Sequence, residues 1–541
     1  MQKMKKTPFQ ILLLWFFLVV VSLNGRSYIP IDETRYVTVA WNMWLNGDYL
    51  VPTLNGMAYS HKPPLLFWLI NLGWKVFGVN DWWPRLVPSL FALASVFITR
   101  NIANRLCPKN TALKDSTSLI LMSSGLWVFF STALMFDMLI AFFTVLGIWG
   151  LLIALQAQKS IQAVKGWFMF TLAISGGLLA KGPAIFLQLL PIALLAPWWS
   201  TDKRLNAKNW YFPLIYSVLG GTIIVLTWAI PAGIHGGSEY QHAIFWGQTA
   251  DRMVDSFAHK RPFWWYLPLL PLLLFPWLFW GAFWQGLIKL NPLDMSIRFC
   301  IAWILPVFVA FSFISGKQIH YILPIFPAFS LLIARVTEKH RANTRLALLP
   351  IVIATFIVGI VLLALPSYAY SHSKLSAWMQ HIPLWLGGLT IVAATLIYFL
   401  PKKSISATIS QLSVISIILL TICLYVVIHT AGNAYDMRPI SIKLKEHESK
   451  NIPVAYLGKY PGIFNFLGRL KRSPELIREN TVPAWFAAHP NGRIIKYFDK
   501  DSKINEQQVE FMQAYKGIKI TIINYQQWQA EISTPSSAQA D

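Results

Sequence analysis

"FQILLLWFFLVVVSLNG", residues 9–25, is an almost purely apolar run, and the polar stretch "SYIPIDETRYVTVAWNMW", residues 27–44, follows it directly. A helix that crosses a bilayer needs about 20 predominantly apolar residues. Similar runs recur along the 541-residue chain, of which 55% is hydrophobic and only 13% is charged. The sequence therefore predicts an α-helical polytopic membrane protein in which residues 27–44 lie just outside the first span.

The apolar runs predict about 13 membrane spans. They are placed at residues 9–25, 84–105, 116–136, 138–157, 166–182, 183–199, 211–230, 263–285, 297–315, 319–337, 346–366, 382–400 and 408–430. The N-terminus "MQKMKKTPFQ" imitates a signal peptide, but "SLNGRSYIP" offers no small-x-small cleavage site. We therefore interpret the first run as an uncleaved anchor.

The formal charge of +23 comes from short clusters of Lys and Arg between the apolar runs. Clusters in alternate connections are typical of the positive-inside bias, so they do not indicate a nucleic-acid partner. This pattern predicts a cytoplasmic N-terminus and, after an odd number of spans, a C-terminus on the periplasmic side of a bacterial inner membrane. The 3 cysteines, Cys107, Cys300 and Cys423, are too few for a disulfide framework, and we expect them to be reduced.

Two stretches on the predicted outer side, 26–83 and 231–262, are long and rich in Trp, Tyr and Pro. Amphipathic pieces such as "YVTVAWNMWL" and "PLLFWLINLGWKVFG" predict helices that lie in the membrane interface. The expected domains are a transmembrane domain at 1–430, with those two stretches as catalytic loops, and a small soluble α/β domain at 431–530. In the latter, "PVAYLGKY", "GRIIKYF" and "IKITIINY" read as strands and "PISIKLKEHESK" as a helix. Residues 531–541 are predicted to be a disordered tail.

Acidic and basic side chains gather in the segments predicted to face outward. "DETRY" supplies Asp32, Glu33 and Arg35; "MAYSHKPPLLFW" supplies Tyr59, His61 and Lys62; "ALMFDMLIAFF" supplies Asp137; "LLAKGPAIF" supplies Lys181; "TADRMVDSFAHKRPFWWYLP" supplies Arg252 and His259; and "SGKQIHYILP" supplies Lys317 and Tyr321. Cations at this depth can hold a phosphate, and carboxylates can accept a proton or stabilise an oxocarbenium-like sugar. Since nucleotide-sugars stay in the cytosol, the inventory favours a lipid-linked sugar donor.

Five of these segments, in order, resemble the polyprenyl-phosphate-dependent glycosyltransferases of the GT-C superfamily. They are "DETRY", "YSHKPPLLFWL", "AKGP", "HKRPFWWYLP" and "GKQIHYILP", and the resemblance covers roughly residues 10–340. Within the superfamily the chain is similar to lipid A aminoarabinose transferases and protein O-mannosyltransferases. The resemblance implies an outward cavity roofed by the interfacial helices and the C-terminal domain.

The resemblance also implies roles for particular residues. Asp32 matches the catalytic acidic residue, with Glu33 and Arg35 as its companions and Asp137 as a second acidic position. Lys62, Lys181 and Arg252 match contacts of the carrier phosphate, and Tyr59 and Tyr321 match the pocket wall. Lys317, in the last matching segment, is also expected to bind substrate. The chain departs from the aminoarabinose transferases at His61, where they typically carry a glutamate, and this puts the identity of the sugar in doubt.

Several alternatives remain open. His61 and His259 could join a carboxylate in a divalent metal site. Asp32 and Glu33 could simply begin a helix, where acids are favoured by its dipole, and Lys181 could extend to the head groups without touching a ligand. The acceptor could be lipid A, another envelope glycolipid or a protein hydroxyl. A lipid-linked-sugar flippase without transfer chemistry and a non-catalytic scaffold are the rival functions. We expect a monomer.

Overall fold

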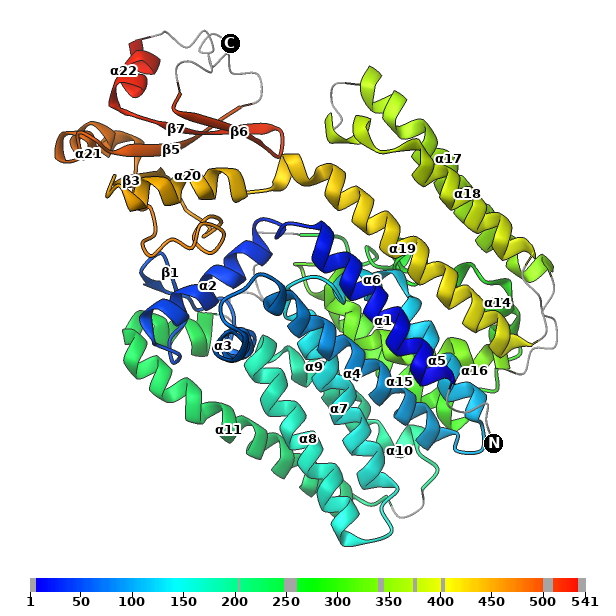
Figure 1. Cartoon of the computed structure of the whole chain (residues 1–541). Coiled ribbons are helices and arrows are strands. Elements are labelled where there is room, and N and C mark those ends of the chain that lie inside the picture. The colour runs from blue at the N-terminus through cyan, green and yellow to red at the C-terminus, as the bar shows by residue number, and fades with distance from the viewer. Residues whose placement is uncertain are drawn as a thin grey trace. The chain divides into compact units, whose positions relative to one another are not determined.

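The computed structural model describes residues 6–202, 205–247, 260–338, 345–372, 377–399, 404–499 and 509–533 (Figure 1). The chain forms two compact units. The first unit comprises Met1–Asn24, Ser60–Ala364 and Pro383–Val426, and the second unit comprises Gly25–Tyr59, Leu365–Ile382 and Val427–Asp541.

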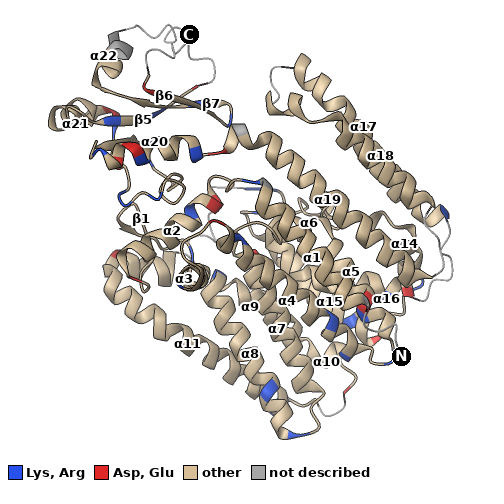
Figure 2. Cartoon of the chain, viewed as in Figure 1, with Lys and Arg blue, Asp and Glu red and all other residues tan. Residues whose placement is uncertain are grey.

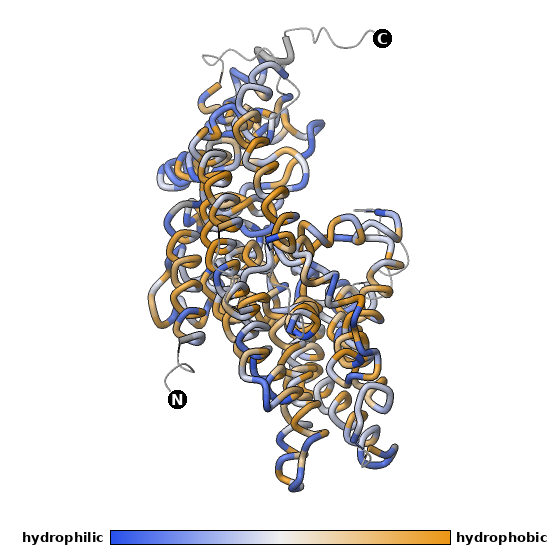
Figure 3. The backbone as a smooth tube through the Cα atoms, turned by 90° about the vertical axis from the view of Figure 1, so that its right-hand side faces the viewer, coloured by the Kyte–Doolittle hydropathy of each residue, from blue (hydrophilic) through white to orange (hydrophobic). Residues whose placement is uncertain are grey.

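The first unit is built of apolar helices (Figure 3). In the described part of the chain, nine helices are long and apolar enough to cross a membrane, which confirms the polytopic helical class. These nine are α1 (Lys6–Gly25), α4 (Trp82–Leu106), α7 (Asp137–Leu155), α8 (Ser160–Lys181), α11 (Ala207–His242), α15 (Met295–Phe313), η5 with α16 (Ile319–Ile325 and Phe326–Glu338), α17 (Arg345–Ser371) and α19 (Ile405–Tyr435). Helices α17 and α19 continue into the second unit.

Shorter elements stand where four continuous spans were expected. Residues 116–136 form α5 (Thr111–Ser123) and α6 (Gly125–Phe130), and residues 183–199 form α9 (Ala184–Leu194) and α10 (Ala196–Trp199). Residues 263–285 form only short turns, η3 (Leu267–Leu269), α13 (Leu270–Leu273) and η4 (Trp277–Phe279), before α14 (Gly281–Ile288), while residues 382–400 form the 16-residue α18 (Leu384–Phe399). Proline lacks an N–H and clashes with the preceding turn of a helix. Pro268, Pro271 and Pro276 therefore explain why residues 263–285 form no continuous helix. The count of 13 stays a prediction.

Helices α7 and α8 pack closely because glycines face each other where they cross. A Cβ added to Gly166 would lie 2.5 Å from the backbone nitrogen of Ala154, and one added to Gly150 would lie 2.6 Å from the carbonyl oxygen of Gly166. Small residues at such positions let helix backbones approach, which is a main source of helix association in membranes. This close contact fixes α8 against α7 along their length.

Gly166→Ala is expected to destabilise the protein by about 1–3 kcal/mol, because the new methyl group meets backbone that cannot move without separating the helices. Gly220→Ala in α11 is the matched control, since its Cβ would lie 3.5 Å from the nearest atom, the Cγ2 of Thr171. Thermal unfolding of the purified protein in detergent measures both. Equal stability of the two variants would show that the α7–α8 contact tolerates a side chain.

The second unit contains a five-stranded sheet and the helix that follows the first span. The sheet has the order β4-β3-β5-β7-β6, in which β4, β3 and β5 are parallel and β7 and β6 are antiparallel to their neighbours. Its strands are β3 (Val454–Leu457), β4 (Glu475–Ile477), β5 (Arg493–Phe498), β6 (Phe511–Tyr515) and β7 (Ile518–Ile523), and its helices are α20 (Arg438–Ser449), α21 (Val482–Ala488) and α22 (Tyr525–Ser533). The three expected strands and α20 are confirmed. The sequence did not reveal β4, which is only three residues long, or β6.

The polar segment after α1 packs against the C-terminal residues within this unit. It contains α2 (Asp32–Asn46) and a hairpin of β1 (Thr53–Leu54) and β2 (Met57–Ala58). The indole N–H of Trp41 donates to the carbonyl of Leu470 at 2.8 Å, and the amide of Asn55 donates to the carbonyl of Tyr460 at 2.7 Å. The stretch quoted at the start is therefore folded against residues more than 400 positions away.

A buried cluster in the C-terminal sheet makes stability depend on pH. Nε2 of His447 lies 2.7 Å from Glu510, and Arg493 also donates to Glu510. Nδ1 of His447 is buried with no hydrogen-bond partner among the described residues. Burial lowers the pKa of His447 despite the neighbouring carboxylate. Burial alone would raise the pKa of Glu510, but hydrogen bonds from Arg493 and His447 lower it.

Both folded-state pKa values lie below their unfolded values, so the unfolded chain binds more protons in acid. The stability that these groups contribute is present near pH 7. It is lost as the pH falls below roughly 6.5, the unfolded pKa of His447, and then below roughly 4.3, that of Glu510. Hydrogen exchange of the β5 and β6 amides in the full chain, corrected for intrinsic rates, is expected to show weaker protection at pH 5 than at pH 7. His447→Gln should flatten the dependence, because it removes the group that titrates in this pH range, whereas Glu479→Gln, at an exposed carboxylate, should not. Stronger protection in acid would contradict this assignment.

Candidate active site

Two ends of the α7–α8 hairpin bring a carboxylate and an ammonium group together. Asp137 begins α7 and Lys181 ends α8, so the antiparallel pair returns Lys181 to the level of Asp137. Nζ of Lys181 donates to Oδ1 of Asp137, and their side chains are 15% and 2% exposed. A carboxylate buried in an apolar helix bundle is costly unless it is paired. Lys181 supplies that partner.

Residues of η5 (Ile319–Ile325) complete the cluster around Asp137. Nε2 of His320 lies 3.9 Å from Oδ1 of Asp137, and the ring of His320 packs edge-on against Tyr321 with centroids 4.9 Å apart. Nζ of Lys181 lies 4.9 Å from the centroid of the Tyr321 ring, which is a cation–π distance. His320 was left without a role by the sequence, although it stands in "GKQIHYILP" next to Tyr321.

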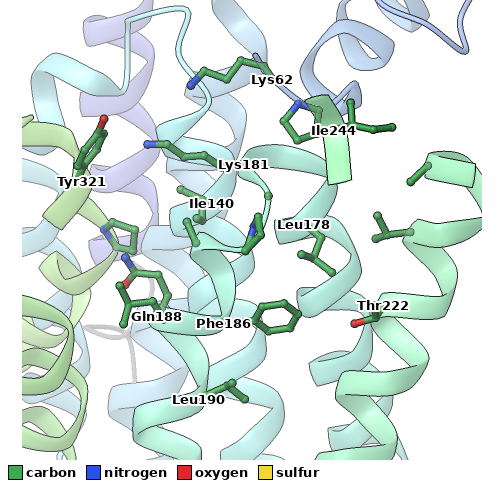
Figure 4. Close-up of a pocket in the computed structure, with 18 of the residues that line it drawn as sticks. Lys62, Ile140, Leu178, Lys181, Phe186, Gln188, Leu190, Thr222, Ile244 and Tyr321 are labelled. Atoms are coloured by element: carbon green, nitrogen blue, oxygen red, sulfur yellow. The ribbon is translucent and has the colours of Figure 1, made fainter. Parts of the chain in front are cut away.

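A cavity of about 990 Å³ opens beside this cluster. Its polar end holds Lys62, Lys181, His61, His320 and Tyr321, and the rest of its wall is mainly apolar, from α8, α9, α11, α15 and η5. Figure 4 shows Lys62 and Lys181 above an apolar space that Leu178, Phe186 and Leu190 border. The volume is at the upper end of the roughly 300–1,000 Å³ that small-molecule pockets have. Two cations at the mouth of an apolar cavity suit an amphiphile with an anionic head.

Lys317 is not among the residues that line this cavity. It is buried, and its ammonium donates to the carbonyls of Arg261 at 2.9 Å and Ile314 at 2.6 Å. The backbone N–H of Arg261 in turn donates to the carbonyl of Ser315 at 3.2 Å. These bonds tie residues 260–261 to residues 314–317, so the structure gives Lys317 a structural position rather than one against a ligand.

The two adjacent acids of α2 have different surroundings. Asp32 is 51% exposed and accepts a hydrogen bond from Arg35 at 2.5 Å. Glu33 is buried, where it pairs with Arg26 and accepts the backbone N–H of Ile29 at 2.7 Å. Glu33 thus holds residues 26–31 in place, whereas Asp32 keeps a carboxylate open to solvent. Arg26 was not among the residues that the sequence analysis singled out.

The candidate residues divide between the two units. Asp32, Glu33, Arg35 and the buried Tyr59 belong to the second unit, while His61, Lys62, Asp137, Lys181 and Tyr321 belong to the first. Their meeting in a single pocket stays a prediction. Arg252 and His259 lie outside the described residues. Within the described residues, no group of three His, Cys, Asp or Glu side chains could hold a metal ion.

The chain is similar in sequence to several known proteins. A family model described as dolichyl-phosphate-mannose-protein mannosyltransferase matches residues 61–230. A Pseudomonas aeruginosa protein named undecaprenyl phosphate-alpha-4-amino-4-deoxy-L-arabinose arabinosyl transferase is 30% identical over 370 residues, which are 68% of this chain and 65% of that protein. The Erwinia tasmaniensis protein of the same name is 27% identical over 401 residues, 71% of this chain and 70% of that protein. The chain thus matches just under two thirds of the length of the Pseudomonas relative.

A solved structure shows the same fold. The crystal structure of ArnT from Cupriavidus metallidurans bound to undecaprenyl phosphate superposes with a TM-score of 0.74, covering 95% of this chain and 97% of that chain at 18% identity. At this identity the likeness concerns the fold. It extends across nearly the whole of both chains.

Proposed function

We propose that this chain is an ArnT-like member of the GT-C superfamily that transfers one sugar from a polyprenyl phosphate to an acceptor outside the cytoplasm. The observation that carries the proposal is the cavity that combines an apolar wall with Lys62 and Lys181 at one end. The isoprenoid chain occupies the apolar part, and the two ammonium groups hold the phosphate. The names of the relatives, which include undecaprenyl phosphate, support this carrier.

In the proposed reaction, an oxygen of the acceptor attacks the anomeric carbon of the sugar. The new bond to the acceptor oxygen forms as the bond from the anomeric carbon to the carrier phosphate breaks, which inverts the configuration. The electron pair of the broken bond stays on the phosphate, where Lys62 and Lys181 neutralise the growing charge. Asp137 keeps Lys181 in place through their ion pair.

Asp32 takes the proton of the acceptor if that group is a hydroxyl, for which an exposed carboxylate is suited. If the acceptor is itself a phosphate, no base is needed, and Asp32 orients the substrate. Arg35 holds Asp32 in either case. Arg252 is proposed as a third phosphate contact, by its match to the family motif alone. His61, at the polar end of the cavity, faces the region of the sugar and is proposed to help select it.

The proposal includes an orientation. The cation clusters between the spans support a cytoplasmic N-terminus, with the active site and the C-terminal domain on the periplasmic side of the inner membrane. The acceptor is then lipid A, another envelope glycolipid or a protein hydroxyl. We propose that the chain acts as a monomer, because one copy supplies every residue invoked here.

Purified protein in nanodiscs, incubated with undecaprenyl-phosphate-linked sugars and with lipid A or acceptor peptides, tests the proposal. Mass spectrometry is expected to show a glycosylated acceptor together with released undecaprenyl phosphate. Movement of the donor across proteoliposomes without any glycosylated product would instead support a flippase. Comparison of 4-aminoarabinose with neutral hexoses identifies the sugar.

A further inference from the structure

A second cavity lies at the opposite ends of α4, α7 and α8 from the candidate active site. It has a volume of about 380 Å³, and its wall comes from the last turns of α4 and α7, the turn that joins α7 to α8, and the first turns of α8. Apart from Ile153, its lining is polar: Arg105, Trp149, Gln156, Gln158, Gln162 and Lys165. No Asp or Glu is among these lining residues. The cavity therefore carries positive charge.

Two side-chain acceptors of this cavity are already used. The Oε1 atom of Gln156 accepts from Nη1 of Arg105 at 3.2 Å, and its amide donates back to the carbonyl of Arg105 at 3.1 Å. The Oε1 atom of Gln162 accepts the backbone N–H of Gln158 at 3.0 Å. These bonds use the oxygens of both carboxamides.

Several donors remain for a ligand. The indole Nε1 of Trp149 is buried with no hydrogen-bond partner among the described residues, which costs free energy unless something else accepts its hydrogen. Arg105 spends one Nη1 donor on Gln156 and retains others, and Lys165 adds an ammonium group. A guanidinium, an ammonium and an indole N–H around one cavity can together bind an anion that has several acceptor oxygens.

We propose that this cavity binds the phosphate of an anionic phospholipid head group. Trp149 and Ile153 belong to α7 and Lys165 to α8, both long and apolar enough to span the membrane, so the cavity lies where such helices reach the head groups. Basic pockets between transmembrane helices bind anionic lipids in this way. The carbonyl ends of α4 and α7 oppose an anion, while the N-terminus of α8 and the two cations favour it. Figure 2 shows Lys and Arg placed mainly at the ends of the membrane helices.

The test measures thermal unfolding of the full chain in nanodiscs of phosphatidylcholine alone and with 20 mol% phosphatidylglycerol or cardiolipin. Wild-type protein is expected to unfold several degrees higher with either anionic lipid. The double variant Arg105→Gln/Lys165→Gln should lose most of that shift. Trp149→Phe, which keeps an aromatic side chain but removes the N–H, should lose part of it. The matched control Lys109→Gln/Lys159→Gln removes two exposed cations near the cavity that are not among its lining residues.

A full shift in the control double variant, with loss in Arg105→Gln/Lys165→Gln, supports the site. Equal loss in both double variants would mean that net surface charge, not this cavity, attracts the lipid, and would overturn the proposal. A shift produced by millimolar inorganic phosphate in phosphatidylcholine, but not by anionic lipid, would assign the cavity to a soluble phosphate instead. Because the readout is unfolding rather than sugar transfer, the result is independent of the proposed function.

Discussion

Asp32→Asn is expected to fold and insert like the wild-type protein and to transfer sugar at less than about one hundredth of its rate, the usual effect of removing a general base. The asparagine has nearly the same shape and can still accept a hydrogen bond from Arg35, but it cannot take a proton. The side chain of Asp32 is half-exposed and does not support the fold as the buried Glu33 does. The loss should therefore appear in kcat with little change in donor affinity.

The matched control for this prediction is Asp499→Asn, which removes another exposed carboxylate from the second unit. It should transfer sugar at the wild-type rate. Turnover from a defined lipid-linked donor is the measurement, with thermal unfolding as the check on folding. Near-normal turnover by Asp32→Asn would exclude Asp32 as the base. If the acceptor proves to be a phosphate and the variant is fully active, Asp32 has an orienting role at most.

Lys181→Met is expected to lower the free energy of unfolding by about 3 kcal/mol and to abolish carrier binding. The variant leaves the buried carboxylate of Asp137 without its ammonium partner, and breaking a buried ion pair from one side costs roughly 3–5 kcal/mol. We place the effect at the lower end because His320, 3.9 Å from Asp137, and the adjacent cavity can still stabilise the charge. Thermal unfolding and binding of undecaprenyl phosphate measure the two effects separately.

The double variant Lys181→Met/Asp137→Leu separates the structural role of Lys181 from its proposed role in binding. Since it removes both charges, it should regain most of the lost stability. It should not regain carrier binding, because the phosphate contact is still missing. Lys75→Met, which removes an exposed lysine from α3 (Leu65–Phe77), is the control and should change neither property. Tight carrier binding by the double variant would restrict Lys181 to its pairing with Asp137.

Parts of the candidate site could be predicted from the sequence because their chemistry is unusual for its setting. Asp137 and Lys181 stand out as charges at the ends of apolar runs, and a buried charge in such a place needs a partner. Lys62 and Tyr321 were found through short motifs, and both line the cavity. Lys317 has the same kind of motif but donates to backbone carbonyls instead. A motif identifies a residue type at a position, whereas the direction of the side chain depends on the surrounding backbone.

By itself, the sequence determined the membrane class, most of the long helices, three strands of the C-terminal sheet and the acidic and basic character of the site. These follow from local composition and periodicity, which any stretch of about 20 residues displays without reference to the rest of the chain. Only the tertiary structure decided that Glu33 pairs with Arg26 while Asp32 stays exposed, that Trp41 packs near Leu470, and that Gln156 and Trp149 shape a donor-rich cavity. Contacts between distant residues depend on how whole helices and strands fit together, and no local pattern in the chain encodes that fit.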